Sequence, residues 1–332
     1  MLVTCDRLRV SPLIVYFFLI NYSTTNYFDM KILMPCLFVI TIASTTHGQT
    51  TTDGLLMPPK NFCTGLMASH DKWTNYWEGT LKRTNDNIGN ITTNSITWFG
   101  NYGVSDKLNI IAAIPYVMVN ASAGTMHKMK GVQDLSIAVK YRFAQLAFDS
   151  SKFRAFVVGS VGMPLTNYTP DYLPLSIGLA TKQATGRLNL NYYMKPGLYI
   201  NSSIGYTFRS NVSLDRPSYF TDGQIYYTNQ VDMQNVLDFS VSVGFINRGF
   251  ESKISYIQQN TQGGGDVRRQ DMPFVSNMMN FSKAELLFMY YLPKPKYVAL
   301  RGAYTYTLAG RNMGQSSMLM GGILYTFHFI KH

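Results

Sequence analysis

The side chains in this chain that could do chemistry are charged residues at alternate positions in apolar segments. In residues 139–143, Lys140 and Arg142 alternate with Val, Tyr and Phe. Successive side chains of a β-strand point to opposite faces, so the charges would share one face and the apolar residues the other. The same pattern selects a set of candidates for the inner face of a β-structure: Lys140, Arg142, Arg187, Arg209, Asp238, Glu251, Lys253, Lys283, Glu285 and Arg301, with Glu78 as a further acid.

Two interpretations of this charged set stay open. Salt bridges among its members would fill and stiffen the interior, and this interpretation is slightly favoured. Alternatively, the set forms a charged track that steers polar solutes. The net charge of +11 fits either a basic rim or an interior that attracts anions. Lys and Arg are dispersed along the chain, so no nucleic-acid partner is indicated.

Catalysis is not indicated by the remaining reactive residues. A lipid hydrolase on the outer wall of a barrel would need a Ser nucleophile beside a His base. No Ser on an apolar face pairs with any of the five histidines, which are His47, His70, His127, His328 and His332. The stretch 263–266 (GGGD) lacks the Lys-Ser that follows in a phosphate loop and is expected to be a flexible loop.

Cysteine supplies neither a disulfide nor a metal site. Cys5 and Cys36 lie in segments that we expect the mature protein to lack, which leaves Cys63 alone. A single thiol without His or acidic partners is a poor metal ligand, so we expect neither a metal nor another cofactor.

The composition indicates a membrane protein that crosses with strands. The chain has 332 residues, is 46% hydrophobic and is only 14% charged, whereas soluble domains carry about 25% charge. Past residue 43, no apolar run approaches the roughly 20 residues of a spanning helix. Low charge without a spanning helix favours a transmembrane β-barrel over a soluble globule and over a helical membrane protein.

Alternating apolar residues then locate the strands. Clear examples are 135–143, 198–208, 237–245 and the final pair within 297–329, and the first strand is expected over 76–82. The pattern predicts an all-β, antiparallel, up-and-down barrel of about 12 strands, closed because unpaired edges are too costly in lipid. A barrel of this size has a narrow lumen.

The connections alternate between short and long, as in outer-membrane barrels with tight periplasmic turns and longer external loops. A secreted β-sandwich would not predict this regularity. The short connections are 103–107, 195–197, 247–249 and 293–296. The long ones are 120–131, 164–186, 210–230 and 261–276.

The N-terminal region predicts export. Lys31 precedes an apolar run and small residues that end at Gly48, which is the layout of a cleaved signal peptide with Met30 as the true start. We therefore expect an upstream extension plus signal peptide over 1–48, a periplasmic or lumen-plugging segment over 49–71, and the barrel over 72–332. Either the segment around 55–59 or the apolar loop 173–180 could act as the plug.

Several short motifs resemble the outer-membrane channel family named for the meta pathway of phenol degradation. They are WFGNYGVSDKLNIIAAIPYV (98–117), GVQDLSIAVKYRF (131–143), GYTFR (205–209) and the last strand. The chain departs from the usual terminal Phe, because Phe329 is followed by Ile-Lys-His. The resemblance implies a transporter for small compounds, hydrophobic or aromatic ones among them, and it defines no binding residues.

The sequence therefore predicts a porin-like channel in the outer membrane of a Gram-negative bacterium. The expected partners are outer-membrane lipid, a small-molecule solute and the barrel-insertion machinery, and the expected state is a monomer. A closed structural or adhesive barrel whose external loops bind a partner is the alternative, and a barrel lipid hydrolase ranks last.

Overall fold

The computed structural model describes residues 50–221, 223–268 and 272–329, which all belong to one compact unit, Ile42–His332. The upstream extension, the start at Met30 and the signal peptide lie outside the described residues. Among those residues, the helical element is the 3-10 turn η1 (Pro170–Tyr172). No helix in this described part is long and apolar enough to cross a membrane.

Twelve antiparallel strands form the wall of a closed barrel, as the sequence predicts. They are β1 (Asn61–Trp73), β4 (Ile91–Ser105), β5 (Leu108–Ala121), β7 (Asp134–Ala147), β8 (Ser151–Pro164), β9 (Gln183–Met194), β10 (Leu198–Arg209), β15 (Val236–Asn247), β16 (Phe250–Thr261), β17 (Asn280–Tyr291), β18 (Val298–Arg311) and β19 (Ser317–His328).

Short accessory strands lie in the connections between the wall strands. They are β2 (Asn75–Glu78), β3 (Leu81–Thr84), β6 (Met129–Val132), β11 (Val212–Ser213), β12 (Tyr219–Thr221), β13 (Gln224–Tyr226) and β14 (Gln230–Val231). β6 pairs with the loop-side part of β5, beyond the residues of β5 that pair with β7. The others form two-stranded pairs: β2 with β3, β12 with β13, and β11 with β14.

The ring closes where the first and last wall strands meet. β1 pairs with β19 from Asn61↔His328 to Lys72↔Ser317, and its other edge pairs with β4. β4 in turn pairs with β5, so every wall strand has two neighbours. Closure satisfies the backbone hydrogen bonds that an open edge would leave exposed in lipid.

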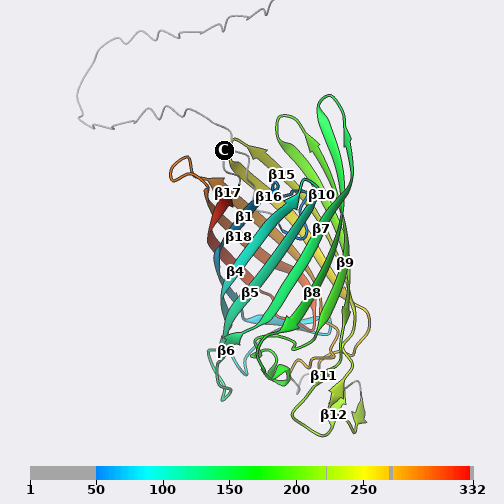
Figure 1. Ribbon diagram of the computed structural model, residues 1–332. Helices are drawn as coiled ribbons and strands as arrows, with labels where there is room; N and C mark the ends of the chain where they lie inside the picture. Colours follow the sequence, from blue (N-terminus) through cyan, green and yellow to red (C-terminus); the bar gives the residue numbers. More distant parts are fainter. Residues whose placement is uncertain (1–49, 222, 269–271, 330–332) are drawn as a thin grey trace, which may run out of the picture. The chain divides into compact units, whose positions relative to one another are not determined.

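The two ends of the barrel differ in their connections (Figure 1). At one end, called here the turn end, the connections span 106–107, 148–150, 195–197, 248–249 and 292–297. At the other, the loop end, they span 74–90, 122–133, 165–182, 210–235 and 262–279, with the short 312–316 as an exception. The alternation in loop length therefore follows the prediction except at the last hairpin.

The start of the barrel needs a correction. β1 begins at Asn61, not at residue 72, and residues 76–82 form the β2–β3 hairpin in the first long loop. Glu78 consequently pairs with Arg83 outside the ring and does not face the interior. The prediction missed β1 because its outward face mixes Leu66 with Thr, His and Lys, so the apolar alternation there is weak.

Elsewhere the alternation holds and sorts the side chains into an exposed outer face and a covered inner face. On β10, Ile200 and Ile204 are exposed while Asn201 and Ser203 are buried. Aromatic rings gather on the outer face near the turn end, where Phe62 and Phe327 stack at 6.3 Å. An apolar outer band with aromatic residues at its border is what a barrel in a membrane requires.

Candidate functional site in the lumen

An ion pair spans three strands of the inner wall. Arg187 on β9 and Asp238 on β15 are both cross-strand partners of Gly205 on the intervening β10. Their side chains meet above that glycine in a bidentate pair, with Nη1–Oδ1 at 2.6 Å and Nη2–Oδ2 at 2.9 Å. A Cβ on Gly205 would lie 2.7 Å from both side chains, so a larger residue here would require the ion pair to shift.

Two further acids on the inner wall have partners. Lys253 lies 3.4 Å from Glu285 across β16 and β17. The hydroxyl of Tyr199 donates a hydrogen bond of 2.7 Å to Glu251, which is buried. These contacts support the interpretation in which paired charges fill and stiffen the interior.

The other basic candidates are not drawn into these pairs. Arg142, Arg209, Lys283 and Arg301 form no salt bridge within 4.0 Å to any described residue. They also lie at different heights, because Arg301 is near the turn end of β18 whereas Arg209 and Lys283 are near the loop ends of their strands. The inner wall thus holds paired charges together with scattered unpaired positive ones, and their role in passage stays a prediction.

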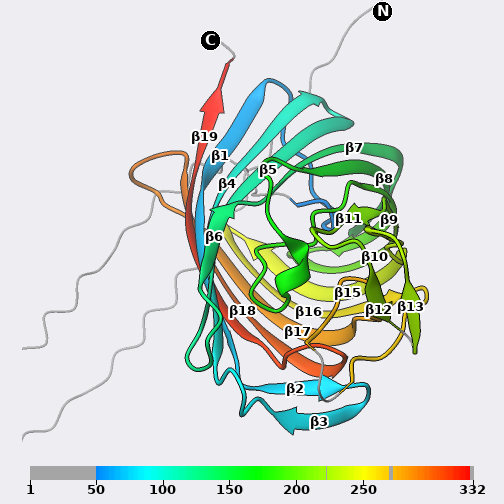
Figure 2. The same cartoon turned by 90° about the horizontal axis from the view of Figure 1, so that it is seen from below.

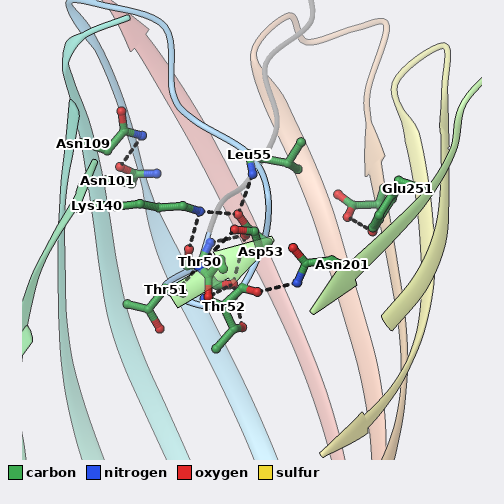
Figure 3. Close-up of polar contacts among 12 residues, drawn as sticks. Thr50, Thr51, Thr52, Asp53, Leu55, Asn101, Asn109, Lys140, Asn201 and Glu251 are labelled. Atoms are coloured by element: carbon green, nitrogen blue, oxygen red, sulfur yellow. Dashed lines mark hydrogen bonds and ion pairs between the residues drawn. The ribbon is translucent and has the colours of Figure 1, made fainter. Parts of the chain in front are cut away.

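Lys140 is the centre of a separate polar cluster, in which the wall binds residues 50–53. The Lys140 side chain is fully buried, and its Nζ donates to Asp53 Oδ1 at 2.6 Å and to the Thr50 carbonyl at 3.0 Å. Asn189 Nδ2 donates to the Thr51 carbonyl at 2.8 Å, and Asn201 Nδ2 donates to the Thr52 carbonyl at 2.7 Å. Figure 3 shows Lys140 and Asn201 reaching the segment from different strands.

This cluster, Lys140, Asn189 and Asn201 with residues 50–53, is called the clamp below. The segment sits close against the wall, because a Cβ on Gly54 would lie 2.2 Å from the Asn191 side chain. Beyond it, Met57 is fully buried in an apolar cluster with inward residues such as Phe99 and Leu287. The segment therefore lies within the barrel and contacts opposite parts of its wall.

Apolar residues of a long loop pack into the loop end of the barrel. Leu175 and Ile177 are buried against the inward side chains of Ile91, Val117 and Val119. We call residues 173–180 the cover. Seen from the loop end, the neighbouring η1 turn lies within the outline of the ring (Figure 2).

Polar contacts and a second apolar cluster fix the cover in place. Tyr168 donates to Asp134 at 2.6 Å, and its hydroxyl accepts from the backbone N–H of Ala180 at 2.9 Å. Burial and the neighbouring Asp134 carboxylate both raise the pKa of Tyr168, which keeps the hydroxyl protonated as a donor. Both ends of the cover, at Leu173 and at Leu179 and Ala180, pack on a cluster formed by other loops: Val212, Leu214, Tyr219, Val231, Met233 and Val275.

The sequence identified Lys140 as an inward charge but not its partners. Asp53 lies in a stretch without periodicity, so nothing local indicates that it enters the lumen. The sequence does carry a signal for Asn189 and Asn191, because they alternate with Leu188, Leu190 and Tyr192 on one strand. No group of His, Cys, Asp and Glu suited to hold a metal ion occurs among the described residues.

Comparisons with known proteins support the fold. No family model and no curated protein matches the sequence. The chain is similar to the crystal structure of the COG4313 outer membrane channel from Pseudomonas putida F1, with a TM-score of 0.63 and 13% identity over 85% of this chain and 100% of that one. This likeness agrees with the resemblance to the meta-pathway channel family and shows an outer-membrane barrel fold.

Two further solved structures match this chain more weakly. The NanC porin matches with a TM-score of 0.45 and 9% identity over 78% of this chain and 98% of that one. The TodX monoaromatic hydrocarbon channel matches at 0.40 and 9% over 82% and 91%.

Proposed function

We propose that this protein is an outer-membrane channel through which small molecules pass without energy coupling. The proposal rests on how residues 50–55 are held inside the lumen. Residues 50–53 are held by hydrogen bonds from wall side chains, and residues 50–55 pair with no wall strand in the described part of the chain. A segment held in this way can leave while the barrel wall stays intact.

The proposed setting is the outer membrane of a Gram-negative bacterium, with lipid against the exposed apolar band and the loop end facing outward. Export through a cleaved signal peptide, insertion by the barrel-insertion machinery and a monomeric state complete the proposal. Intact mass of the protein from outer membranes tests the export step, because cleavage near Gln49 should yield a mature chain that begins close to that residue. Retention of Met1 would contradict it.

The proposed solutes are small molecules. The resemblance to the meta-pathway family supports hydrophobic or aromatic compounds among them. The inner wall adds a polar preference, since unpaired Arg142, Arg209 and Arg301 share it with ion pairs. No cofactor is part of this function.

Single-channel conductance tests the proposal directly. Deletion of residues 50–57, which leaves β1 intact, should raise conductance at least tenfold above that of the natural protein because the segment no longer fills the lumen. A deletion to 70 would remove most of β1 and is unsuitable. Replacing the outer β2–β3 hairpin, residues 75–84, with a Gly-Ser linker is the matched control and should leave conductance unchanged.

The rival function is a closed structural or adhesive barrel, and the packed cover at the loop end favours it. That barrel would conduct in neither the natural protein nor the variant lacking residues 50–57. If neither protein conducts although both are folded and inserted, the channel proposal is overturned.

A further inference from the structure

The wall of the clamp has the chemistry of a binding site. Lys140 is fully buried, and a buried ammonium requires an anionic partner. Asn189 and Asn201 are also buried, at 0% and 3% exposure, and both aim an amide N–H group at the same short segment. Three strands, β7, β9 and β10, thus direct hydrogen-bond donors to one place in the lumen.

Residues 50–53 meet these donors as a bound ligand would. Asp53 supplies a carboxylate to Lys140, and Thr51 and Thr52 supply carbonyl oxygens to the two asparagines. The wall recognises no Thr side chain in these hydrogen bonds. It recognises a carboxylate flanked by neutral oxygen acceptors, which a small molecule can also provide.

Two polar atoms at the site remain unused. The Oδ1 atoms of Asn189 and Asn201 are buried and have no hydrogen-bond partner among the described residues. A buried acceptor without a partner is unfavourable, and a donor on a ligand would satisfy it. A hydroxyl group suits this position because it can donate to Oδ1 and accept from Nδ2.

We infer that Lys140, Asn189 and Asn201 form a binding site for small hydroxycarboxylates, and that the chain's own residues 50–53 fill it at rest. This inference rests on the proposed channel function, because the site then lies on the solute's route. The solute carboxylate replaces that of Asp53 at Lys140, and the solute hydroxyl contacts the asparagines. A single buried cation matches a single negative charge, so a monocarboxylate fits better than a dianion.

Calorimetry with L-lactate on the purified variant lacking residues 50–57 tests the site. Lactate should bind to this variant, and lactamide, which keeps the shape and the hydroxyl but lacks the charge, should bind at least tenfold more weakly. Adding Lys140→Met should likewise weaken lactate binding at least tenfold. Adding Lys152→Met, which removes an exposed lysine at the turn end, should leave it unchanged.

A second variant keeps the test valid if the deletion prevents folding. Asp53→Asn retains the whole chain but removes the competing carboxylate, so it should bind lactate at least tenfold more tightly than the natural protein. Equal binding of lactate and lactamide, or lactate binding that survives Lys140→Met, would overturn the inference.

The two proposals fail separately. A deletion variant that conducts but does not bind lactate would overturn the binding site and leave the channel. A variant that binds lactate but carries no current would overturn the channel and leave the site.

Discussion

The clamp and the cover both occupy the barrel, but different forces hold them. At the clamp, one ion pair and amide-to-carbonyl hydrogen bonds hold residues 50–53. At the cover, Leu175 and Ile177 are buried among aliphatic side chains. The first contact is polar and specific, and the second is apolar and depends on shape.

This difference separates what can respond to a solute from what cannot. An internal hydrogen bond contributes about 0.5–1.5 kcal/mol net, and a buried ion pair roughly offsets its own desolvation. A charged solute that offers the same groups can therefore displace residues 50–53 at small net cost. The cover gains from burying apolar surface, at about 25 cal/mol per Å², and a polar solute offers no equivalent. We expect the clamp to open in response to a solute, and the cover to narrow the loop end by a constant amount without closing it.

The largest expected effect comes from breaking the ion pair at the clamp. Asp53→Asn leaves the Lys140 ammonium buried without its anion, and breaking a buried pair from one side costs about 3–5 kcal/mol. The segment should leave the site, and open probability in single-channel recordings should rise at least tenfold. Thr51→Ala is the matched control. Thr51 contributes only its backbone carbonyl to the clamp, and alanine keeps that carbonyl, so open probability should not change. Equal open probability in the two variants would show that polar contacts do not hold the segment.

The second prediction concerns the stability of the barrel wall, which should depend on neither the clamp nor the cover. Val241 lies on the outer face of β15, and Val241→Arg should destabilise the barrel by about 2–4 kcal/mol if it lies near the membrane midplane. Ser242→Arg, on the inner face, should cost far less because the guanidinium reaches other polar groups. Unfolding titrations with urea in lipid vesicles measure both. Similar losses would mean that the strand is inside out.

The third prediction concerns the cover. Leu175→Ala removes a fully buried side chain and should destabilise the packed loop by about 2 kcal/mol, at the low end for core leucines because a loop can collapse around the gap. The rate of proteolysis within residues 165–182 should increase while the wall strands stay protected. Leu165→Ala, at a 44% exposed position, is the control and should change little. Unchanged proteolysis would mean that Leu175 does not anchor the cover.

The wall could be predicted from sequence because its rule is local. Ile137, Val139 and Tyr141 alternate with inward residues whatever the rest of the chain does, so this alternation predicts β7 correctly. β1 escaped because Thr64, His70 and Lys72 stand on its outer face. An apolar residue at every second position is enough to identify a strand. A face that mixes apolar and polar residues does not identify one.

The clamp could not be predicted because its partners are far apart in sequence. Asp53 and Lys140 are 87 residues apart, and Asn201 and Thr52 are 149 apart. Likewise, Arg187 and Asp238 were both identified as inward, but their pairing depends on the register of β9 and β15 against Gly205. Contacts of this kind follow from how the barrel closes, which no local pattern encodes.

The smallest expected effect is a modest preference for anions. Arg209 and Arg301 face the lumen without a salt bridge to a described residue, whereas Arg187 is neutralised by Asp238. Fixed positive charge in a narrow, poorly screened lumen attracts anions, and the inner acids reduce this bias. Reversal potentials across a salt gradient, measured on the variant lacking residues 50–57, should show anion preference that falls when both arginines are changed to Ser.

The control for this last measurement removes the same charge from the rim. Changing Lys107 and Lys152 to Ser, both exposed at the turn end, should leave the reversal potential nearly unchanged because water and salt screen those positions. An equal shift in both double variants would assign the bias to overall charge and not to the lumen. A bias that persists without Arg209 and Arg301 would place its source at the clamp, where removal of residues 50–57 exposes Lys140.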